Sequence, residues 1–103
     1  MTNQELKADL RDIRYYHTHK SMFERAEDTG FKNAVVKKTD RYAQAMSNAP
    51  PRLYALFIAL YVSGKTQKAT AQEWHVSEWY IRSIDRKLQT YLIKEMSGGL
   101  ENQ

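Results

Sequence analysis

The 103-residue chain contains no cysteine, and it has only three histidines. Without cysteine, disulfide bonds and thiolate metal sites are excluded, and a reducing compartment such as the cytoplasm is expected. His17 and His19 stand two positions apart, so their side chains would diverge on a helix and cannot both bind one metal ion. His75 has no neighbouring set of carboxylates and histidines. The sequence therefore predicts neither a metal site nor any other cofactor.

Long apolar runs are also missing. The longest apolar stretch, Leu53 to Val62, is about ten residues, whereas a membrane-spanning helix needs about 20. The first residues, MTNQELKADLRD, contain no apolar run, so we expect no signal peptide. These features predict a cytoplasmic protein without a membrane partner.

Sequence patterns typical of enzymes are absent as well. There is no glycine-rich phosphate-binding loop and no nucleophile elbow. The carboxylates near the start of the chain alternate with basic residues at helical spacing, which is typical of a solvated charged face and not of an acid–base pair. These residues are Glu5, Lys7, Asp9, Arg11, Asp12 and Arg14. We therefore predict that the protein is not an enzyme.

With only four glycines and two prolines, the chain has few turn signals, and no segment alternates apolar and polar residues long enough to predict a strand. An all-α fold is expected. Residues 1–48 should form a helical hairpin. Its first helix carries apolar residues from Leu6 to Ala26 and ends at Thr29–Gly30. Its second helix runs from Phe31 to Met46, with Phe31, Ala34, Val35, Tyr42, Ala45 and Met46 on the inner side.

Residues 49–97 are expected to form three helices. The first runs from Pro51 to Val62 and is apolar almost all round, so it should be the core helix. The second covers about Gln67 to Trp74. The third begins after Ser77 and ends near Met96, with Ile81, Ile84, Leu88, Tyr91 and Leu92 facing inward. Ser97–Gly98–Gly99 should end this helix, and residues 98–103 should form a frayed tail.

The stretch from residue 64 to residue 82 predicts a helix-turn-helix. A glycine marks the gap before a short helix, a small residue allows two helices to touch, and apolar residues flank a tight turn. A serine then caps the next helix, an acid occupies its first turn, and a new apolar stripe begins. The residues with these roles are Gly64, Thr66, Ala71, Trp74, Val76, Ser77, Glu78 and Ile81.

The helix-turn-helix pattern within residues 53–92 resembles that of a known family. The matching residues are Tyr61, Gly64, Thr66, Ala71, Trp74, Val76, Ser77, Ile81 and Leu88. They are similar to the region 4 helix-turn-helix of bacterial sigma factors and to the small phage and prophage late-gene regulators built on it, the ArpU-type and RinA-type proteins. The resemblance implies a regulator of phage late genes in the cytoplasm of a bacterial host cell, with RNA polymerase as a possible second partner.

The chain departs from this family's pattern at two places. The usual glutamate–isoleucine before the alanine is Ala69–Thr70 here, which weakens a core contact. The usual turn glycine is His75, which must adopt the turn conformation with a Cβ atom. Histidine is one of the residues enriched among such exceptions. Because of these two departures, the exact geometry of the turn cannot be taken from that of the family.

The third helix would place its first residues against base edges in the major groove. Arg82 is the candidate for a bidentate contact to guanine. Trp79 would pack on a thymine methyl or a sugar; alternatively, it covers the core or meets another chain. The remaining candidates lie at the helix start or near the phosphates, and for the lysines before the turn solvation is an equal alternative. These candidates are Lys65, Lys68, Ser77, Glu78, Tyr80, Ser83, Arg86 and Lys87.

The net charge of +4 suits double-stranded DNA as a partner without requiring it. Two alternatives to a regulator remain at this stage. One is a small terminase-like component of phage DNA packaging, although such proteins usually carry the motif before their oligomerisation helices. The other is a helical interaction module that does not bind DNA.

The N-terminal hairpin has too few apolar residues for a core of its own. Its aromatic side chains should therefore cover the C-terminal helices or meet a second copy in a homodimer. We favour the homodimer, with residues 3–47 as the interface or its main support. These aromatic residues are Tyr15, Tyr16, Phe23, Phe31 and Tyr42.

Overall fold

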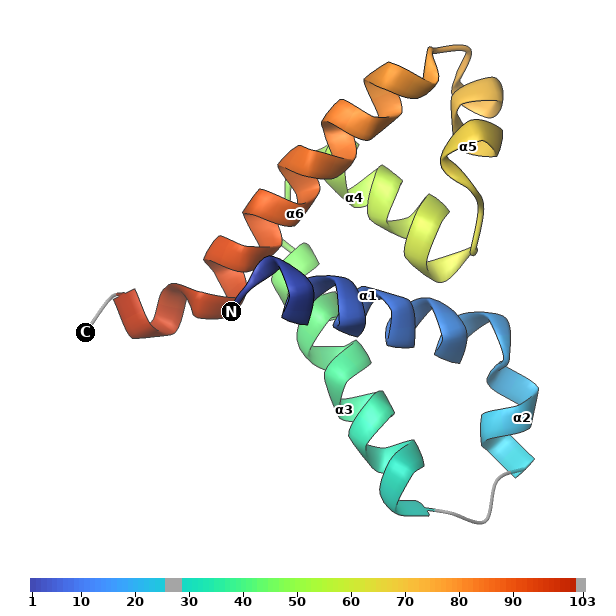
Figure 1. Ribbon diagram of the computed structural model, residues 1–103. Helices are drawn as coiled ribbons and strands as arrows, with labels where there is room; N and C mark the ends of the chain where they lie inside the picture. Colours follow the sequence, from blue (N-terminus) through green and yellow to red (C-terminus); the bar gives the residue numbers. More distant parts are fainter. Residues whose placement is uncertain (26–28, 102–103) are drawn as a thin grey trace.

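The structure is a computed structural model that describes the backbone of residues 1–25 and 29–101, with the side chains of all of these except residues 29, 31 and 98–101. Within these ranges it contains helices and no strand, as the sequence predicts (Figure 1). The elements are α1 (Asn3–Thr18), α2 (Lys20–Arg25), α3 (Thr29–Met46), α4 (Pro51–Phe57), the π-helical turn η1 (Ile58–Val62), α5 (Gln67–Trp74) and α6 (Glu78–Glu101).

Helix α1 begins with a reciprocal cap and ends earlier than predicted. The Thr2 hydroxyl accepts a hydrogen bond from the Glu5 amide at 3.1 Å, and the Glu5 carboxylate accepts one from the Thr2 amide. At the other end the Thr18 hydroxyl donates to the Arg14 carbonyl at 2.9 Å, and His19 leaves the helical conformation. Side chains that hydrogen-bond to nearby carbonyls compete with helix continuation. The prediction of one uninterrupted first helix is therefore wrong.

After the break at His19, α2 leaves α1 in a new direction and packs its Phe23 against the end of α1 (Figure 1). Phe23, only 3% exposed, lies edge-on to Tyr15 and Tyr16, with ring centres 6.0 and 5.3 Å away. His19 itself stacks on Tyr15 at 4.1 Å. This small aromatic cluster fixes the direction in which the chain leaves α1.

The predicted helix end at Thr29–Gly30 is also wrong, because these two residues begin α3. A glycine is tolerated there, since the amides of a first turn have no partner inside the helix in any case. Val35, Tyr42 and Met46 are buried as expected and Ala45 is half-buried, but Ala34 is exposed. Ala26 and the side chain of Phe31 lie outside the described residues.

Helix α4 and the turn η1 form the centre of the molecule, which confirms the predicted core helix. Leu56, Phe57 and Leu60 are each no more than 4% exposed. The Ser63 amide donates to the Ile58 carbonyl at 2.8 Å, which widens the last turn. Gly64 then ends the helix with a φ of +72°.

One hydrophobic core joins both halves of the chain. Helix α1 lies between α3 and the C-terminal helices (Figure 1). Its buried face and that of α3 belong to the same cluster as the C-terminal apolar residues. The predicted boundary near residue 48 therefore separates two parts of one core. The N-terminal residues in this cluster are Leu6, Leu10, Ile13, Tyr42 and Met46; their C-terminal partners include Leu56, Leu60, Ile81, Leu88 and Leu92.

Helix α6 is longer than predicted, because it continues through Gly98 and Gly99 to Glu101. Each glycine in a helix interior costs only about 1 kcal/mol relative to alanine. A helix that is already packed along most of its length can absorb that cost. The predicted end at residues 97–99 is wrong, and residues 102–103 of the predicted tail lie outside the described residues.

Candidate nucleic-acid interface

Helix α5 spans the residues that the sequence predicts, and it starts with a threonine cap. The Thr66 hydroxyl accepts a hydrogen bond from the Ala69 amide at 3.0 Å. Thr70, fully buried, donates its hydroxyl to the Thr66 carbonyl at 2.9 Å. The buried hydroxyl of Thr70 thus has its hydrogen-bonding capacity satisfied, so it costs less stability than an unpaired buried hydroxyl would.

The turn between α5 and α6 depends on a left-handed residue. His75 has φ 58° and ψ 43°, the conformation that the sequence analysis required of it. The next amide, that of Val76, donates back to the Ala71 carbonyl at 3.0 Å. Ala71 is 3% exposed, and its small side chain allows α5 to pack closely against α6.

Helix α6 begins after Ser77, as predicted. The Ser77 hydroxyl accepts a hydrogen bond from the Tyr80 amide at 3.0 Å. Glu78 occupies the first turn, where the helix dipole favours a negative charge, and its carboxylate lies 3.9 Å from the Arg82 guanidinium. The cap and this ion pair fix the start of the helix and hold Arg82 on its outer side.

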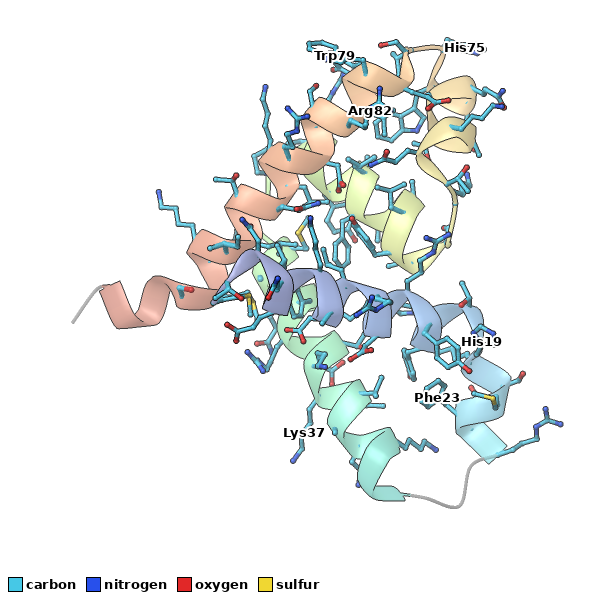
Figure 2. The ribbon with its side chains drawn as sticks, viewed as in Figure 1. His19, Phe23, Lys37, His75, Trp79 and Arg82 are labelled. Carbon is cyan, nitrogen blue, oxygen red and sulfur yellow. The ribbon has the colours of Figure 1, made fainter. Side chains whose placement is uncertain are left out.

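The outer face of α6 carries most of the predicted contact residues. Trp79 is 68% exposed, so the alternative that it covers the core is wrong. Figure 2 shows Trp79 and Arg82 at the corner where α5 meets α6, near His75. Ser83 is half-buried and donates its hydroxyl to the Tyr80 carbonyl at 2.7 Å. The exposed candidates are Lys68, Ser77, Glu78, Trp79, Arg82, Arg86 and Lys87.

Two candidates do not belong to this open face. Tyr80 turns toward α4, where its hydroxyl accepts a hydrogen bond from Arg52 and its ring centre lies 5.5 Å from the Arg52 guanidinium. Lys65 pairs its ammonium with Glu73 of α5. The predicted phosphate contact of Tyr80 would require the Arg52 contact to break, and the charge of Lys65 is already largely compensated.

A buried carboxylate beneath the interface was missed by the sequence analysis. Asp85 of α6 is 7% exposed and accepts hydrogen bonds from Tyr61 at 3.0 Å, Gln89 at 3.1 Å and Gln67 at 3.3 Å. Burial raises the pKa of Asp85, and these hydrogen bonds oppose the rise. The sequence did contain an indication that Asp85 is buried. Position 85 lies on the same helix face as Ile81 and Leu88, and a carboxylate on such an apolar face is unusual.

This cluster joins η1, α5 and α6. Tyr61 comes from η1, Gln67 from the first turn of α5, and both Asp85 and Gln89 from α6. Burial is the main cause that raises the pKa of Tyr61, and the neighbouring Asp85 carboxylate adds to it. The neutral phenol therefore stays a donor to Asp85 at physiological pH. The cluster sets how α6 lies on its support.

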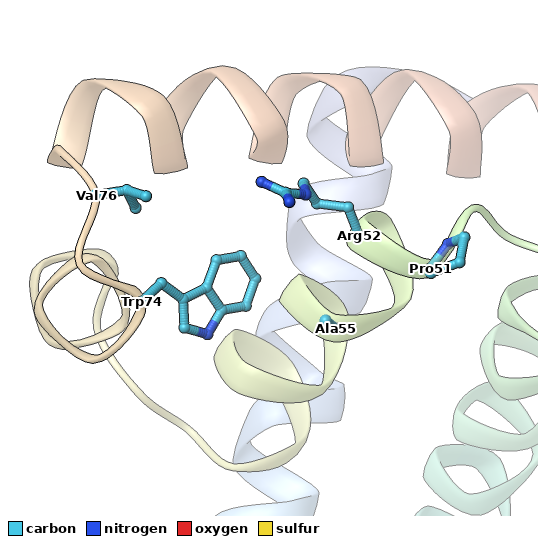
Figure 3. A pocket seen from close by; sticks show the side chains of 5 residues that line it. All are labelled: Pro51, Arg52, Ala55, Trp74 and Val76. Atoms are coloured by element: carbon cyan, nitrogen blue, oxygen red, sulfur yellow. The ribbon is translucent and has the colours of Figure 1, made fainter.

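A hollow of about 500 Å³ lies between α4 and the turn (Figure 3). It is lined by Pro51, Arg52 and Ala55 of α4 together with Trp74 and Val76. The Trp74 ring points toward α4 in Figure 3. Trp74 and Val76 are both half-buried and pack against the core, as the predicted apolar flanks of the turn should.

Two searches of the described residues bear on other classes of site. Among the residues that the structure describes, no group of three or more histidines or carboxylates is placed to hold a metal ion. Within the same residues, no helix is long and apolar enough to cross a membrane.

Comparison with known proteins adds no relative. No protein-family model, no curated protein and no solved structure matches the chain.

Proposed function

We propose that the protein is a sequence-specific regulator of transcription that binds double-stranded DNA by inserting the start of α6 into the major groove. The observation that carries the proposal is the exposed, capped first part of α6, set on α5 by the left-handed turn at His75. An α-helix fits the major groove, and in helix-turn-helix proteins the N-terminal residues of the second helix contact base edges.

The exposed side chains suit distinct roles on DNA. Arg82 can donate two hydrogen bonds to O6 and N7 of one guanine, and its ion pair with Glu78 restrains it before binding. Trp79, largely exposed, offers an apolar surface for a thymine methyl or a sugar. Lys68, Arg86 and Lys87 are exposed cations suited to phosphates, which position the helix without distinguishing sequences.

The resemblance to region 4 proteins supports a narrower assignment. By that resemblance the regulated genes are late genes of a phage or prophage, and RNA polymerase in the cytoplasm of the bacterial host is a second partner. The exposed face of α6 would serve DNA in either case. Testing for retention of the protein on purified bacterial RNA polymerase, with and without promoter DNA, checks this part of the proposal. Absence of retention under both conditions would contradict it.

We also propose that the protein acts as a homodimer through its N-terminal half. Tyr15 and Met22 are 46% and 45% exposed, and Tyr54 of the neighbouring core helix is 47% exposed. Contact with a second copy would remove the apolar surface of these side chains from water, which favours association in proportion to the area buried. Sedimentation of the full-length chain at tens of micromolar should give the mass of two chains, and a monomer would contradict this part of the proposal.

Selection from a pool of random duplexes tests DNA binding most broadly. We expect the wild-type protein to enrich a defined site. The Arg82→Ala variant should enrich a site with one position relaxed. Lys37→Ala, an exposed change on α3, is the control and should select the wild-type site. Failure of the wild-type protein to bind duplexes even at low salt would contradict the proposal.

A further inference from the structure

The charges of α1 separate onto two sides of the helix. Both carboxylates of the middle turns face α3: Asp9 and Asp12 lie 3.1 and 2.9 Å from the ammonium of Lys38. Asp9 also accepts a hydrogen bond from the Tyr42 hydroxyl at 2.7 Å. The predicted charged face is therefore solvated for the most part, as Asp12 is still 50% exposed, but its acids are not mixed with its bases: Asp9 and Asp12 pair with Lys38.

The basic residues of α1 form the opposite stripe. Lys7, Arg11 and Arg14 follow the spacing i, i+4 and i+7, and all three are exposed. Arg14 donates to the Gly64 carbonyl at 2.8 Å. Within the described part of the chain, Lys7 and Arg11 form no ion pair with a carboxylate. This stripe thus carries an uncompensated positive charge.

Two adjoining hollows run beside this stripe, and we call them together the α1 trough. The first, about 250 Å³, lies between α1 and α6 and is lined by Lys7, Leu10, Arg11, Arg14, Tyr61 and Gln89. The second, about 300 Å³, continues to the start of α5 and is lined by Arg14, Leu60, Tyr61, Lys65, Thr66 and Gln67. They share Arg14 and Tyr61, so they adjoin, and the basic stripe borders both.

The α1 trough meets the side of α6 that carries the proposed DNA contacts. Gln89, which lines it, follows Arg82 and Arg86 at i+7 and i+3, so these three residues lie along one side of α6. The charge of Lys7 also reaches the cluster beneath: burial raises the pKa of Asp85, and Lys7 is among the groups that oppose the rise. Positive charge therefore continues from the start of α6 along to α1.

We propose that the α1 trough binds the sugar–phosphate backbone of duplex DNA next to the segment contacted by α6. This inference rests on the proposed function and extends the contact beyond the helix-turn-helix. The seven helical steps from Lys7 to Arg14 span about 10 Å at 1.5 Å per step. Along one DNA strand, that length corresponds to about three phosphates.

Duplex DNA fits the trough better than an acidic protein surface does. The trough is concave, Lys7, Arg11 and Arg14 border it along α1, and its α6 side at Gln89 lies in line with Arg86 and Arg82 on the face assigned to bases. Charged side chains that contact phosphates add affinity for any sequence and make it depend on salt. The α1 trough should therefore contribute to affinity and to its salt dependence, and not to the choice of sequence.

The test compares two double variants of equal charge change on a labelled random-sequence duplex of about 30 base pairs, or some three helical turns. Lys7→Gln with Arg11→Gln removes the trough cations. Lys37→Gln with Arg41→Gln, at the same spacing on exposed positions of α3, is the matched control. Figure 2 places Lys37 at the end of the molecule away from Trp79. Arg14 is left intact because it also holds Gly64.

Fluorescence anisotropy between about 50 and 200 mM salt gives the slope of log affinity against log salt concentration. We expect the trough variant to have a slope shallower by about 2, and an affinity about tenfold lower or more at the low-salt end, because each lost phosphate contact removes about 0.9 from the slope. The control variant should keep the wild-type slope. Circular dichroism should show the same helix content for all three proteins.

Three results would overturn the inference. If the trough variant keeps the wild-type slope while Arg86→Ala lowers it, α6 binds DNA without the trough, the proposed function stands, and an acidic protein becomes the partner of the stripe. If both double variants lower the slope equally, only net charge matters. If the wild-type protein does not bind the duplex at all, the proposed function fails together with this inference.

Discussion

Asp85 is a buried side chain that joins α6 to the elements on which it packs. It is buried, and it accepts hydrogen bonds from Tyr61, Gln67 and Gln89, which come from three different elements. A buried carboxylate is stable only when its oxygens have such partners. The contribution of Asp85 to the free energy of unfolding should therefore change with pH, and the direction of the change shows whether burial or hydrogen bonding dominates.

Burial raises the pKa of Asp85 in the folded protein, as its dominant effect. A carboxyl whose pKa is higher in the folded state than in the unfolded state contributes stability that is full below the unfolded pKa and is lost as pH rises through the folded pKa. We therefore expect wild type to gain stability relative to Asp85→Asn as pH falls from 7 to about 4. Urea midpoints at both pH values measure this. A relative loss at low pH would mean that the hydrogen bonds outweigh burial.

The Ser77 hydroxyl satisfies one amide at the start of α6. Ser77→Ala should lower the free energy of unfolding by about 1 kcal/mol, because that amide loses its partner. The measurement is the urea midpoint, with Ser21→Ala on the exposed side of α2 as the control. An unchanged midpoint with an unchanged slope for Ser77→Ala would contradict the cap.

Among the helices, α5 and the start of α6 were predictable because their signals are local. The caps Thr66 and Ser77, the stop at Gly64 and the left-handed turn residue His75 all lie within the segment that they shape. The break at His19 was not predicted although its contacts are also local, because a threonine that donates to the carbonyl four residues back occurs in uninterrupted helices as well. The α3 start at Thr29 likewise overrides the usual stop signal of a glycine.

The residues of the candidate site also differ in whether a local sequence pattern predicts them. The exposed residues Trp79, Arg82 and Arg86 follow from the apolar stripe of one helix, so the sequence was sufficient to place them. The contact of Tyr80 with Arg52, the cluster at Asp85 and the α1 trough all join segments far apart in the sequence. Such contacts depend on how helices pack, and no local pattern specifies them.

The junction of η1 with the end of α1 gives a test of this packing. Gly64 has a φ of +72°, and a Cβ atom added there would lie 2.6 Å from the Thr18 Cγ2 methyl. Gly64→Ala should destabilise the fold by about 2 kcal/mol because alanine disfavours the left-handed conformation. The clash with Thr18 should add a further loss of stability. Adding Thr18→Ser removes that methyl and keeps the hydroxyl. It should restore the stability lost to the clash, but not the stability lost to the left-handed conformation. Thermal unfolding measures both steps. No recovery in the double variant would contradict the close approach.

For the molecule as a whole, the single core makes the helix-turn-helix depend on the N-terminal helices. A chain that starts at Asn48 would lose Leu6, Leu10 and Ile13 of α1 and Tyr42 and Met46 of α3, and so expose the facing apolar surface. Each fully buried side chain of this kind contributes about 1.5–3 kcal/mol. We expect this truncated chain to lack a cooperative unfolding transition by circular dichroism. A sharp transition would show that residues 49–97 form an independent domain after all.

The central claim is that the start of α6 distinguishes DNA sequences, and Arg82 tests it most directly. On a site selected by the wild-type protein, affinities are measured by anisotropy for that site and for a duplex with the contacted guanine replaced. Wild type should distinguish the two by about 1–3 kcal/mol, and Arg82→Ala should bind both alike. Arg86→Ala should keep the discrimination and lower the salt slope by about 1. If Arg82→Ala discriminates as well as wild type at every position of the site, the start of α6 does not contact the bases as proposed.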